Sequence, residues 1–270
     1  MRIQRICAAY FSPTGNCRKI ALGFAETLAE IEECDFEEYD FTLPSGREQV
    51  LEFREDDYVA VVLPAYAGRI PNKILPWFKE CFRGNGAKAT AIISFGNRNP
   101  DSALGELKQE LERNGFKVVS AAAVVSEHAF TEKLAGGRPD EEDMAEIRRF
   151  AGESLKTADR NEPVDIGSRG QVNPYYVPLR SDGKPAKFLK AKPVRDDGKC
   201  IECGQCAEVC PMGSINAENT GETAGICIKC HGCIHECSQG ARYFDDSDLI
   251  SHREMLISNF AGRCENEFYI

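Results

Sequence analysis

Two closely spaced cysteine runs near the C-terminus constrain this chain more than any other feature. The first run reads CIECGQCAEVC from Cys200, and the second reads CIKCHGCIHEC and ends at Cys237. Both have the spacing C-x2-C-x2-C-x3-C. Three thiolates at this short step can surround one iron–sulfur cube, while the fourth points away toward a neighbouring cube. Since such iron ions are soft and need thiolates, the spacing predicts iron–sulfur centres.

Two other uses of clustered cysteines fit this pattern less well. Structural zinc sites take four sulfurs from two C-x2-C pairs, which leaves no role for a third cysteine at the same step. Disulfide frameworks are typical of small secreted chains, whereas this chain has 270 residues. We therefore favour iron–sulfur clusters over zinc or disulfides.

The whole cysteine segment resembles a bacterial two-cluster ferredoxin. The resemblance implies that each cluster takes three cysteines from one run and the fourth from the other. One cluster would be held by Cys200, Cys203, Cys206 and Cys237, and the other by Cys210, Cys227, Cys230 and Cys233. Ser238 stands where the family pattern has a proline, which shapes only the turn. Because eight cysteines fill two cubes, we predict that His231 and His235 are exposed surface residues.

Residues 1–160 alternate between strand-like and helix-like segments. The strand candidates, several of them nearly continuous apolar runs, are 3–10, 35–39, 58–64, 87–95 and 117–125. The helical candidates between and after them are 17–30, 74–82, 102–114 and 141–158. Apolar runs of this kind are typical of parallel strands that are covered on both faces. The alternation predicts an α/β fold with an open, doubly wound parallel sheet of five strands.

The loop after the first strand candidate, FSPTGNCRK, favours a bound phosphate. Its small polar residues lead directly into a helix, where backbone N–H groups and the helix dipole attract an anion. The candidate donors are Ser12, Thr14, Gly15, Asn16 and Cys17. No Lys or Arg lies within residues 12–16, and the Walker pattern is missing. The alternative is an ordinary turn and helix cap without a ligand.

The same loop resembles the S/T-x-T-G-N-T phosphate loop of flavodoxins, with Cys17 in place of the last threonine. The resemblance implies a flavodoxin-like sheet that binds flavin mononucleotide (FMN) at its carboxyl edge. Two further loops would then contact the flavin ring. They comprise Ala65, Tyr66, Ala67 and Gly68 after the third strand, and Phe95, Gly96, Asn97, Arg98 and Asn99 after the fourth.

Roles for individual side chains follow from this resemblance. Tyr66 would stack on the flavin, Gly68 would present its peptide to the flavin N5, and Arg98 would offset charge on a reduced flavin. For Cys17 we favour a packed thiol over a redox-active one. For His128 we favour a neutral histidine satisfied by the backbone over a proton donor. We assign Trp77 to packing.

The chain divides into four predicted segments. Residues 1–160 form the flavodoxin-like domain, and 161–193 form a connector rich in proline and glycine. Residues 194–246 form a small α+β ferredoxin-like domain with two clusters. Residues 247–270 form a closing helix and a tail.

Charge and thiol content limit the partners and the compartment. The formal net charge is −10, and residues 200–270 hold 11 acidic against 4 basic side chains. Such acidity disfavours nucleic acid and fits a basic redox partner. No apolar run approaches the roughly 18 residues of a membrane span. The cysteines outside the two runs fit a reducing cytoplasm, and the clusters suggest an anaerobe.

In domain order, the chain resembles the flavodoxin–ferredoxin fusion proteins of the EFR-type ferredoxin family. The resemblance implies an electron-transfer flavoprotein that passes single electrons between two [4Fe-4S] clusters and FMN, and on to a redox partner protein or a small acceptor. One alternative is an FMN-dependent reductase of a small acceptor such as a quinone. A second alternative is an iron–sulfur protein whose flavodoxin-like domain is a flavin-free docking module.

Overall fold

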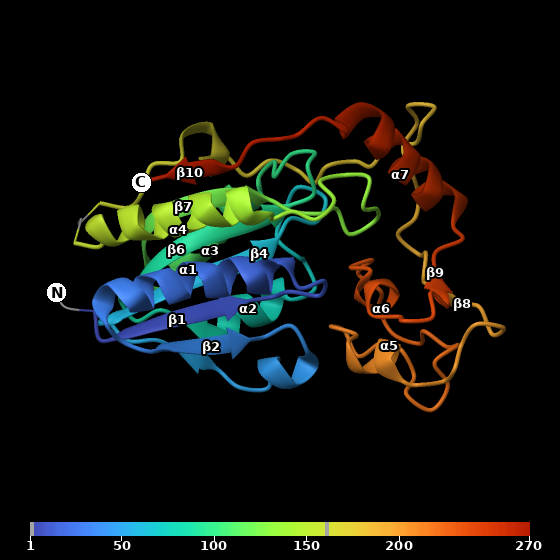
Figure 1. Cartoon of the computed structure of the whole chain (residues 1–270), viewed down its shortest axis with the longest axis horizontal. Coiled ribbons are helices and arrows are strands. Elements are labelled where there is room, and N and C mark those ends of the chain that lie inside the picture. Colours follow the sequence, from blue (N-terminus) through green and yellow to red (C-terminus); the bar gives the residue numbers. More distant parts are fainter. Residues whose placement is uncertain (1–2, 160–161) are drawn as a thin grey trace.

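The structure, a computed structural model, describes residues 3–159 and 162–270. Its larger body is built on a six-stranded sheet, in which β4 and β6 are the long central strands (Figure 1). The strands of this sheet are β1 (Arg5–Tyr10), β2 (Phe36–Asp40), β4 (Asp57–Pro64), β6 (Lys88–Phe95), β7 (Lys117–Val125) and β10 (Glu267–Tyr269). Two short strands, β3 (Leu51–Glu52) and β5 (Phe82–Arg83), form a separate parallel pair.

The strand order is β10-β7-β6-β4-β1-β2. All neighbours pair in parallel except β10, which runs antiparallel to β7. Without β10 the order is the 2-1-3-4-5 arrangement of flavodoxin-like doubly wound sheets. The five predicted parallel strands are therefore confirmed, and their carboxyl ends meet at one edge. The sixth strand was not predicted, because a three-residue segment gives too short a pattern to recognise.

Helices cover both faces of the sheet. On one face, α1 (Asn16–Glu32) and α4 (Glu141–Lys156) pack into a core that includes Phe24 and Phe150. On the other face, α2 (Leu75–Cys81) and α3 (Ala103–Arg113) pack into a core that includes Phe78. Trp77 packs at the border of this second core, as predicted. Two short 3-10 helices, η1 (Pro44–Arg47) and η2 (Gly167–Gly170), lie in the connections.

The cysteine-rich segment forms a second, smaller unit beyond the carboxyl ends of the strands (Figure 1). We call residues 194–246 the cluster unit. It contains the antiparallel pair β8 (Val194–Arg195) and β9 (Arg242–Tyr243) and two one-turn helices, α5 (Gln205–Glu208) and α6 (Gly232–His235). The predicted closing helix is α7 (Ser247–Phe260), which leads the chain back to the sheet.

The connector lies against the body. Tyr176 N–H donates to the Ala67 carbonyl (3.0 Å), and its ring lies 3.8 Å from the Arg98 guanidinium carbon. Residues 160 and 161, at the predicted limit between the first domain and the connector, lie outside the described residues. The predicted domain limits therefore stay predictions.

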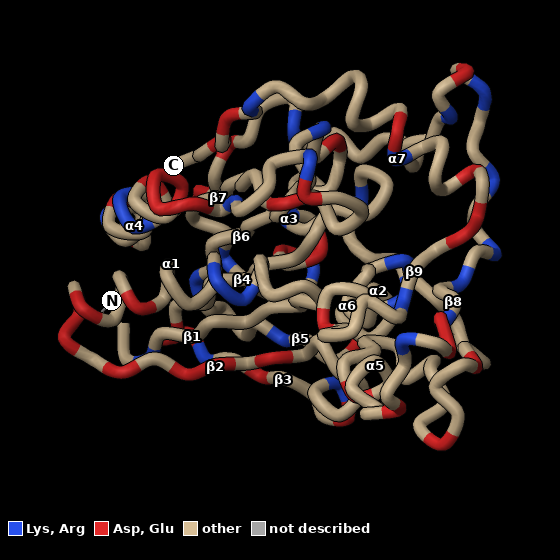
Figure 2. Tube along the Cα trace, turned by 45° about the vertical axis from the view of Figure 1, so that its right-hand side comes forward, with Lys and Arg blue, Asp and Glu red and all other residues tan. Residues whose placement is uncertain are grey.

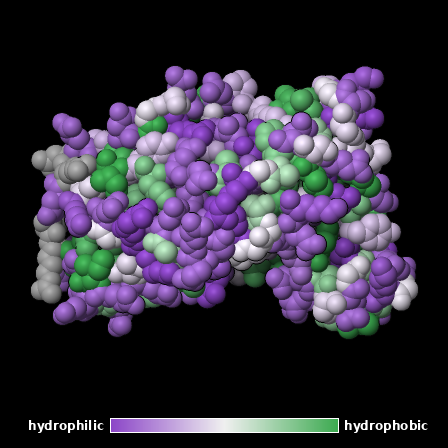
Figure 3. Space-filling view, turned by 45° about the horizontal axis from the view of Figure 1, so that its top comes forward, coloured by the Kyte–Doolittle hydropathy of each residue, from purple (hydrophilic) through white to green (hydrophobic). Residues whose placement is uncertain are grey.

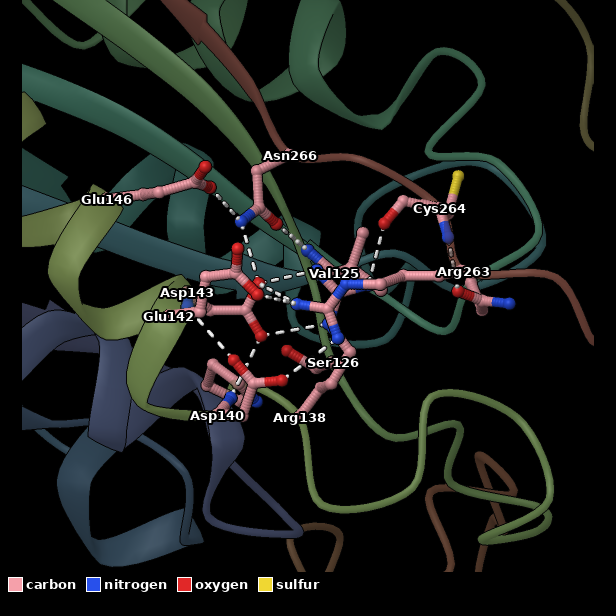
Figure 4. A network of polar contacts seen from close by, with 12 residues as sticks. Val125, Ser126, Arg138, Asp140, Glu142, Asp143, Glu146, Arg263, Cys264 and Asn266 are labelled. Atoms are coloured by element: carbon pink, nitrogen blue, oxygen red, sulfur yellow. Dashed lines mark hydrogen bonds and ion pairs between the residues drawn. The ribbon is translucent and has the colours of Figure 1, made fainter.

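A buried polar network fixes the C-terminal tail to the body (Figure 4). Arg138 Nε donates to Asp143 at 2.9 Å, and Arg138 also donates to the Cys264 carbonyl at 2.7 Å. Asn266 donates to Asp143 and accepts from the backbone N–H of Val125. These bonds place β10 beside β7 and close the sheet at that edge.

None of the helices within residues 3–159 and 162–270 combines the length and the apolar character that a bilayer crossing requires.

Candidate cluster sites and the facing edge of the sheet

The two cysteine runs fold as a structural repeat. In both, the residue two positions after the first cysteine has a left-handed backbone, with φ 56° at Glu202 and at Lys229. This geometry turns backbone N–H groups toward sulfur in a matching pattern. The bonds run from Glu202 to Cys200 (3.4 Å), Lys229 to Cys227 (3.4 Å), Ser214 to Cys210 (3.3 Å) and Ala241 to Cys237 (3.2 Å).

The thiols fall into two groups of close neighbours. The pKa of Cys230 is raised to about 12, chiefly by burial and to a smaller extent by Cys233, Cys227 and Cys210. Burial likewise raises the pKa of Cys206, to which Cys200 and Cys237 add. Cys203 is exposed. Cys203 aside, these groups match the interleaved ligand sets implied by the ferredoxin resemblance, although ligation itself stays a prediction. Bound iron would reverse the shifts, because a coordinating thiol is deprotonated.

One of the two groups, with three cysteines of the second run and one of the first, surrounds a hollow in the cluster unit. Its lining includes all four cysteines of that group, Cys210, Cys227, Cys230 and Cys233. Apolar side chains, including Ile215 and Phe244, complete the wall. An apolar wall around thiolates excludes water and tunes the potential of a bound cluster. The residues present therefore fit a cluster at this place.

In the part of the chain that the structure describes, no three His, Cys, Asp or Glu side chains lie close enough together to hold a single metal ion. The cysteine groups are arranged differently, since a cubane takes one thiolate on each iron and its ligands stand apart.

Arg242 is a buried cation that the sequence reasoning missed. It is 3 % exposed. Burial raises the pKa of Cys206 and of Cys233, and Arg242 offsets part of this rise. It also donates to the Thr220 carbonyl at 2.7 Å. A positive charge that acts on both cysteine groups compensates part of their negative charge. In the sequence, the one indication of this role was that Arg242 is a basic residue in a largely acidic segment.

The two histidines of the second run differ from one another. His235 is exposed, as predicted, and its Nε2 lies 3.0 Å from the Ala129 carbonyl. The prediction that His231 is exposed is wrong, because only 7 % of it is accessible. Its ring stacks between Phe130 of the larger body and Phe244 of the cluster unit. Sequence spacing gave no sign of this contact, which forms only when the two units pack together.

The phosphate loop has the predicted form. Gly15 caps α1 with φ 87°, and a side-chain cap is missing from this helix, which the structure describes in full. The space where a Gly15 Cβ would stand is open. Ser12 Oγ accepts from the Arg18 N–H at 2.9 Å, and Ser12 N–H donates to Thr42, a residue without a sequence signal. Thr14 and Asn16 are partly accessible. This end of the site fits a phosphate.

Cys17 and His128 have the properties that we favoured from the sequence. Cys17 is 3 % exposed, and burial raises the pKa of its thiol to about 12, so it is a packed thiol. His128 Nδ1 accepts from the Phe130 N–H at 3.1 Å. Burial lowers the pKa of His128 to about 4, which keeps the ring neutral near pH 7.

The first loop predicted to contact a flavin ring is closed on itself. Ala67 and Gly68, with φ 49° and 74°, form a tight turn between Tyr66 and Arg69. The Gly68 carbonyl accepts from Ser102 N–H at 3.0 Å, so it is already engaged. Ala65 N–H likewise bonds to Ser94. Tyr66 is partly buried, and its pKa is raised first by loss of hydration and then by Cys230, Cys17 and Cys227.

The second loop is also engaged within the chain. Phe95 is buried, and the His128 ring packs so closely on Gly96 that a Cβ there would stand 2.4 Å from it. The Asn97 side chain donates to the carbonyls of Phe260 and Gly262 and accepts from Cys264 N–H. Two further side chains are held by neighbours: Arg98 pairs with Asp101, and Asn99 accepts from Arg169.

The cluster unit packs against this edge through its second run. A Cβ on Gly232 would stand 2.7 Å from the carbonyl oxygen of Pro13, in the phosphate loop. Phe130 stacks on His231 with ring centroids 4.6 Å apart, and the Tyr66 phenol lies near Cys230. The phosphate end of an FMN therefore fits this structure, and the two loops predicted to contact its ring are bonded within the chain.

Comparisons with known proteins give separate matches for the cysteine-rich segment and for the larger body. Residues 193–216 match the 4Fe-4S binding domain family. The match includes the first cysteine run, and no curated protein matches the chain.

The larger body is similar to solved flavodoxin structures. A flavodoxin from the Archaea is 14 % identical with a TM-score of 0.42, and the match covers 58 % of this chain and 100 % of that one. A short-chain flavodoxin associated with a PDU bacterial microcompartment is 17 % identical with a TM-score of 0.38, over 59 % of this chain and 100 % of that one. Rubredoxin oxygen:oxidoreductase from Desulfovibrio gigas is 16 % identical with a TM-score of 0.39, over 58 % and 35 %. The fold assignment rests on the strand order.

Proposed function

We propose that this protein is an electron-transfer iron–sulfur protein that holds two [4Fe-4S] clusters, of the flavodoxin–ferredoxin fusion type. The observation that carries the proposal is the interleaving of the two cysteine runs. Cys230 has Cys210 of the first run among its neighbours, and Cys206 has Cys237 of the second. Each cluster exchanges one electron with a partner, and the cysteines, the N–H···S bonds and the apolar wall hold it in place and set its potential.

Anaerobic purification tests this proposal. We expect about eight iron and eight sulfide per chain, with two interacting signals in electron paramagnetic resonance (EPR) spectra after reduction. The double variant Cys203→Ala/Cys237→Ala removes two ligands of one cluster and should keep the other. Cys230→Ala/Cys237→Ala removes one ligand from each and should impair both. Cys81→Ala, outside the runs, is the control. Zinc in place of iron, or equal losses in both double variants, would contradict the proposal.

For the phosphate loop we propose the phosphate group of FMN as the ligand. The uncapped α1 and the open space at Gly15 support it. The competing role is a flavin-free docking module, which is favoured by the packing of Gly232 on Pro13. FMN counted per chain after anaerobic reconstitution separates the two roles: one FMN per chain supports a flavoprotein, and none supports docking alone.

A further inference from the structure

The two cysteine runs differ at one equivalent position. The runs begin at residues 200 and 227, so position 204 corresponds to position 231. Both residues precede a one-turn helix and have a left-handed backbone, with φ 79° at Gly204 and 61° at His231. Glycine adopts this conformation freely, whereas histidine does so at a steric cost. A strained residue of this kind at a site suggests a role for its side chain.

The His231 ring is held firmly but lacks a hydrogen-bond partner. It stacks 4.6 Å from Phe130 on one side and 4.9 Å from Phe244 on the other. Only 7 % of the residue is exposed, and its buried Nε2 has no partner among the described residues. Buried polar atoms are almost always paired, because leaving one unpaired is costly. A ligand in the adjoining space would satisfy Nε2.

The adjoining space is the hollow described above, which cysteines of both runs line. His231 lines it together with Cys210, Cys227, Cys230 and Cys233. A cluster bound there would place sulfide and thiolate sulfurs, which accept hydrogen bonds, beside the ring. The first run has no counterpart, because Gly204 carries no side chain.

We propose that Nε2–H of His231 donates a hydrogen bond to a sulfur of the cluster held by Cys210, Cys227, Cys230 and Cys233. This inference rests on the proposed two-cluster function. The bond stabilises the extra negative charge of the reduced cluster, so it raises the potential of this cluster above that of the other. An electron that an external one-electron donor gives to the first cluster then moves to the second, which is reduced as the first is reoxidised, with no proton transferred. The accepting cluster is the one packed against the sheet edge.

Redox titration of the anaerobic full-length protein, followed by EPR, tests the bond. His231→Phe keeps a ring between Phe130 and Phe244 but removes the N–H, and it should lower the midpoint potential of one cluster only. His231→Asn keeps an N–H donor in a residue that tolerates the left-handed backbone, and it should restore part of the shift. His235→Phe, on the same helix but exposed, should leave both potentials unchanged.

Two outcomes separate this inference from the proposed function. Absence of iron and sulfide from the wild-type protein would refute the two-cluster function itself. Intact clusters whose potentials do not move in His231→Phe, or move equally, would refute only the hydrogen bond. A measurement on His235→Phe labelled with 15N-histidine does not depend on the stability of a His231 variant. A 15N coupling to a reduced cluster supports the bond, and its absence overturns it.

Discussion

The buried ion pair between Arg138 and Asp143 ties the tail to the body at the scale of single residues. Both side chains are at most 5 % exposed. Removing one partner leaves the other charge buried and unpaired, which typically costs about 3–5 kcal/mol. We expect Arg138→Ala to lower the free energy of unfolding by about this amount, as measured by denaturant titration under anaerobic conditions.

A matched control lies on α4, the helix that contains Asp143. Arg148 pairs with Glu141, and both side chains are largely exposed. Arg148→Ala should change the stability by no more than about 1 kcal/mol. Equal effects of the two substitutions would show that the tail network does not stabilise the fold.

His128 predicts a pH dependence of folding. Its pKa is lowered from 6.5 to about 4, chiefly by burial, so between these values the unfolded chain binds a proton that the folded chain does not. Stability should therefore fall as the pH is lowered from about 6.5 toward 4, by about 1–3 kcal/mol from this residue. Unfolding titrations at several pH values should show a shallower fall in His128→Gln than in the wild type. An identical slope would contradict the assignment.

The same scale shows what sequence can and cannot predict. The cysteine spacing predicted two groups of thiols because cluster geometry fixes the steps between ligands. Cys17 and His128 were predicted correctly because a buried, satisfied side chain is the common case for these residues. Asn97 and His231 have their partners in segments distant in the chain, Asn97 at residues 260–264 and His231 at Phe130. No local pattern encodes such contacts.

At the scale of elements, the contact of α6 with the phosphate loop joins the two units. A Cβ at Gly232 would meet the Pro13 carbonyl oxygen, which is backbone and cannot rotate away. We expect Gly232→Val to push the cluster unit off the sheet edge. Hydrogen exchange should then increase in residues 11–16 while the cluster content stays unchanged.

The repeat within the cluster unit supplies the control for this experiment. Gln205 occupies the equivalent position of α5, since 205 and 232 differ by the same 27 residues as the two runs. Gln205→Val should leave exchange in the phosphate loop as in the wild type. Unchanged exchange in Gly232→Val would show that this contact does not hold the units together.

Element prediction succeeded where patterns were long. The buried strands β4 and β6 have eight residues each, and their apolar runs predicted parallel pairing. β10 has three residues, and its pairing depends on Asn266 and Arg169, the latter bonded to Glu267 at 2.8 Å. Distant segments likewise hold the loops predicted to contact the flavin, since the tail bonds to Asn97 and the connector bonds to Ala67 and Asn99. Sequence periodicity contains no information about such contacts.

At the scale of the whole molecule, the cluster unit carries acidic residues together with exposed apolar ones. Acidic residues lie along β2 and near α5 (Figure 2). In the view of Figure 3 the surface is mostly hydrophilic, and hydrophobic side chains appear on both lobes. Among those exposed on the cluster unit are Ile201, 63 % accessible beside Cys200, and Ile226 at 54 %. An acidic surface with exposed apolar residues near a cluster favours a basic redox partner.

Small reductants of opposite charge test this electrostatic prediction without a known partner. The acidic surface attracts the methyl viologen radical cation. Salt screens this attraction, so reduction by methyl viologen should become slower as the salt concentration increases. Reduction by the dithionite-derived anion should become faster with salt, because screening weakens repulsion. Stopped-flow absorbance of the clusters measures both rates.

The surface near the first cysteine run should dominate the effect. Glu202 lies between Cys200 and Cys203 with its side chain 79 % exposed, whereas Glu55 is 58 % exposed on the larger body. Glu202→Gln should reduce the salt dependence for both reductants, and Glu55→Gln should change it little. If the two reductants responded to salt in the same direction, the field at the cluster unit would not guide electron entry. Equal effects of the two substitutions would instead place the entry point away from the first run.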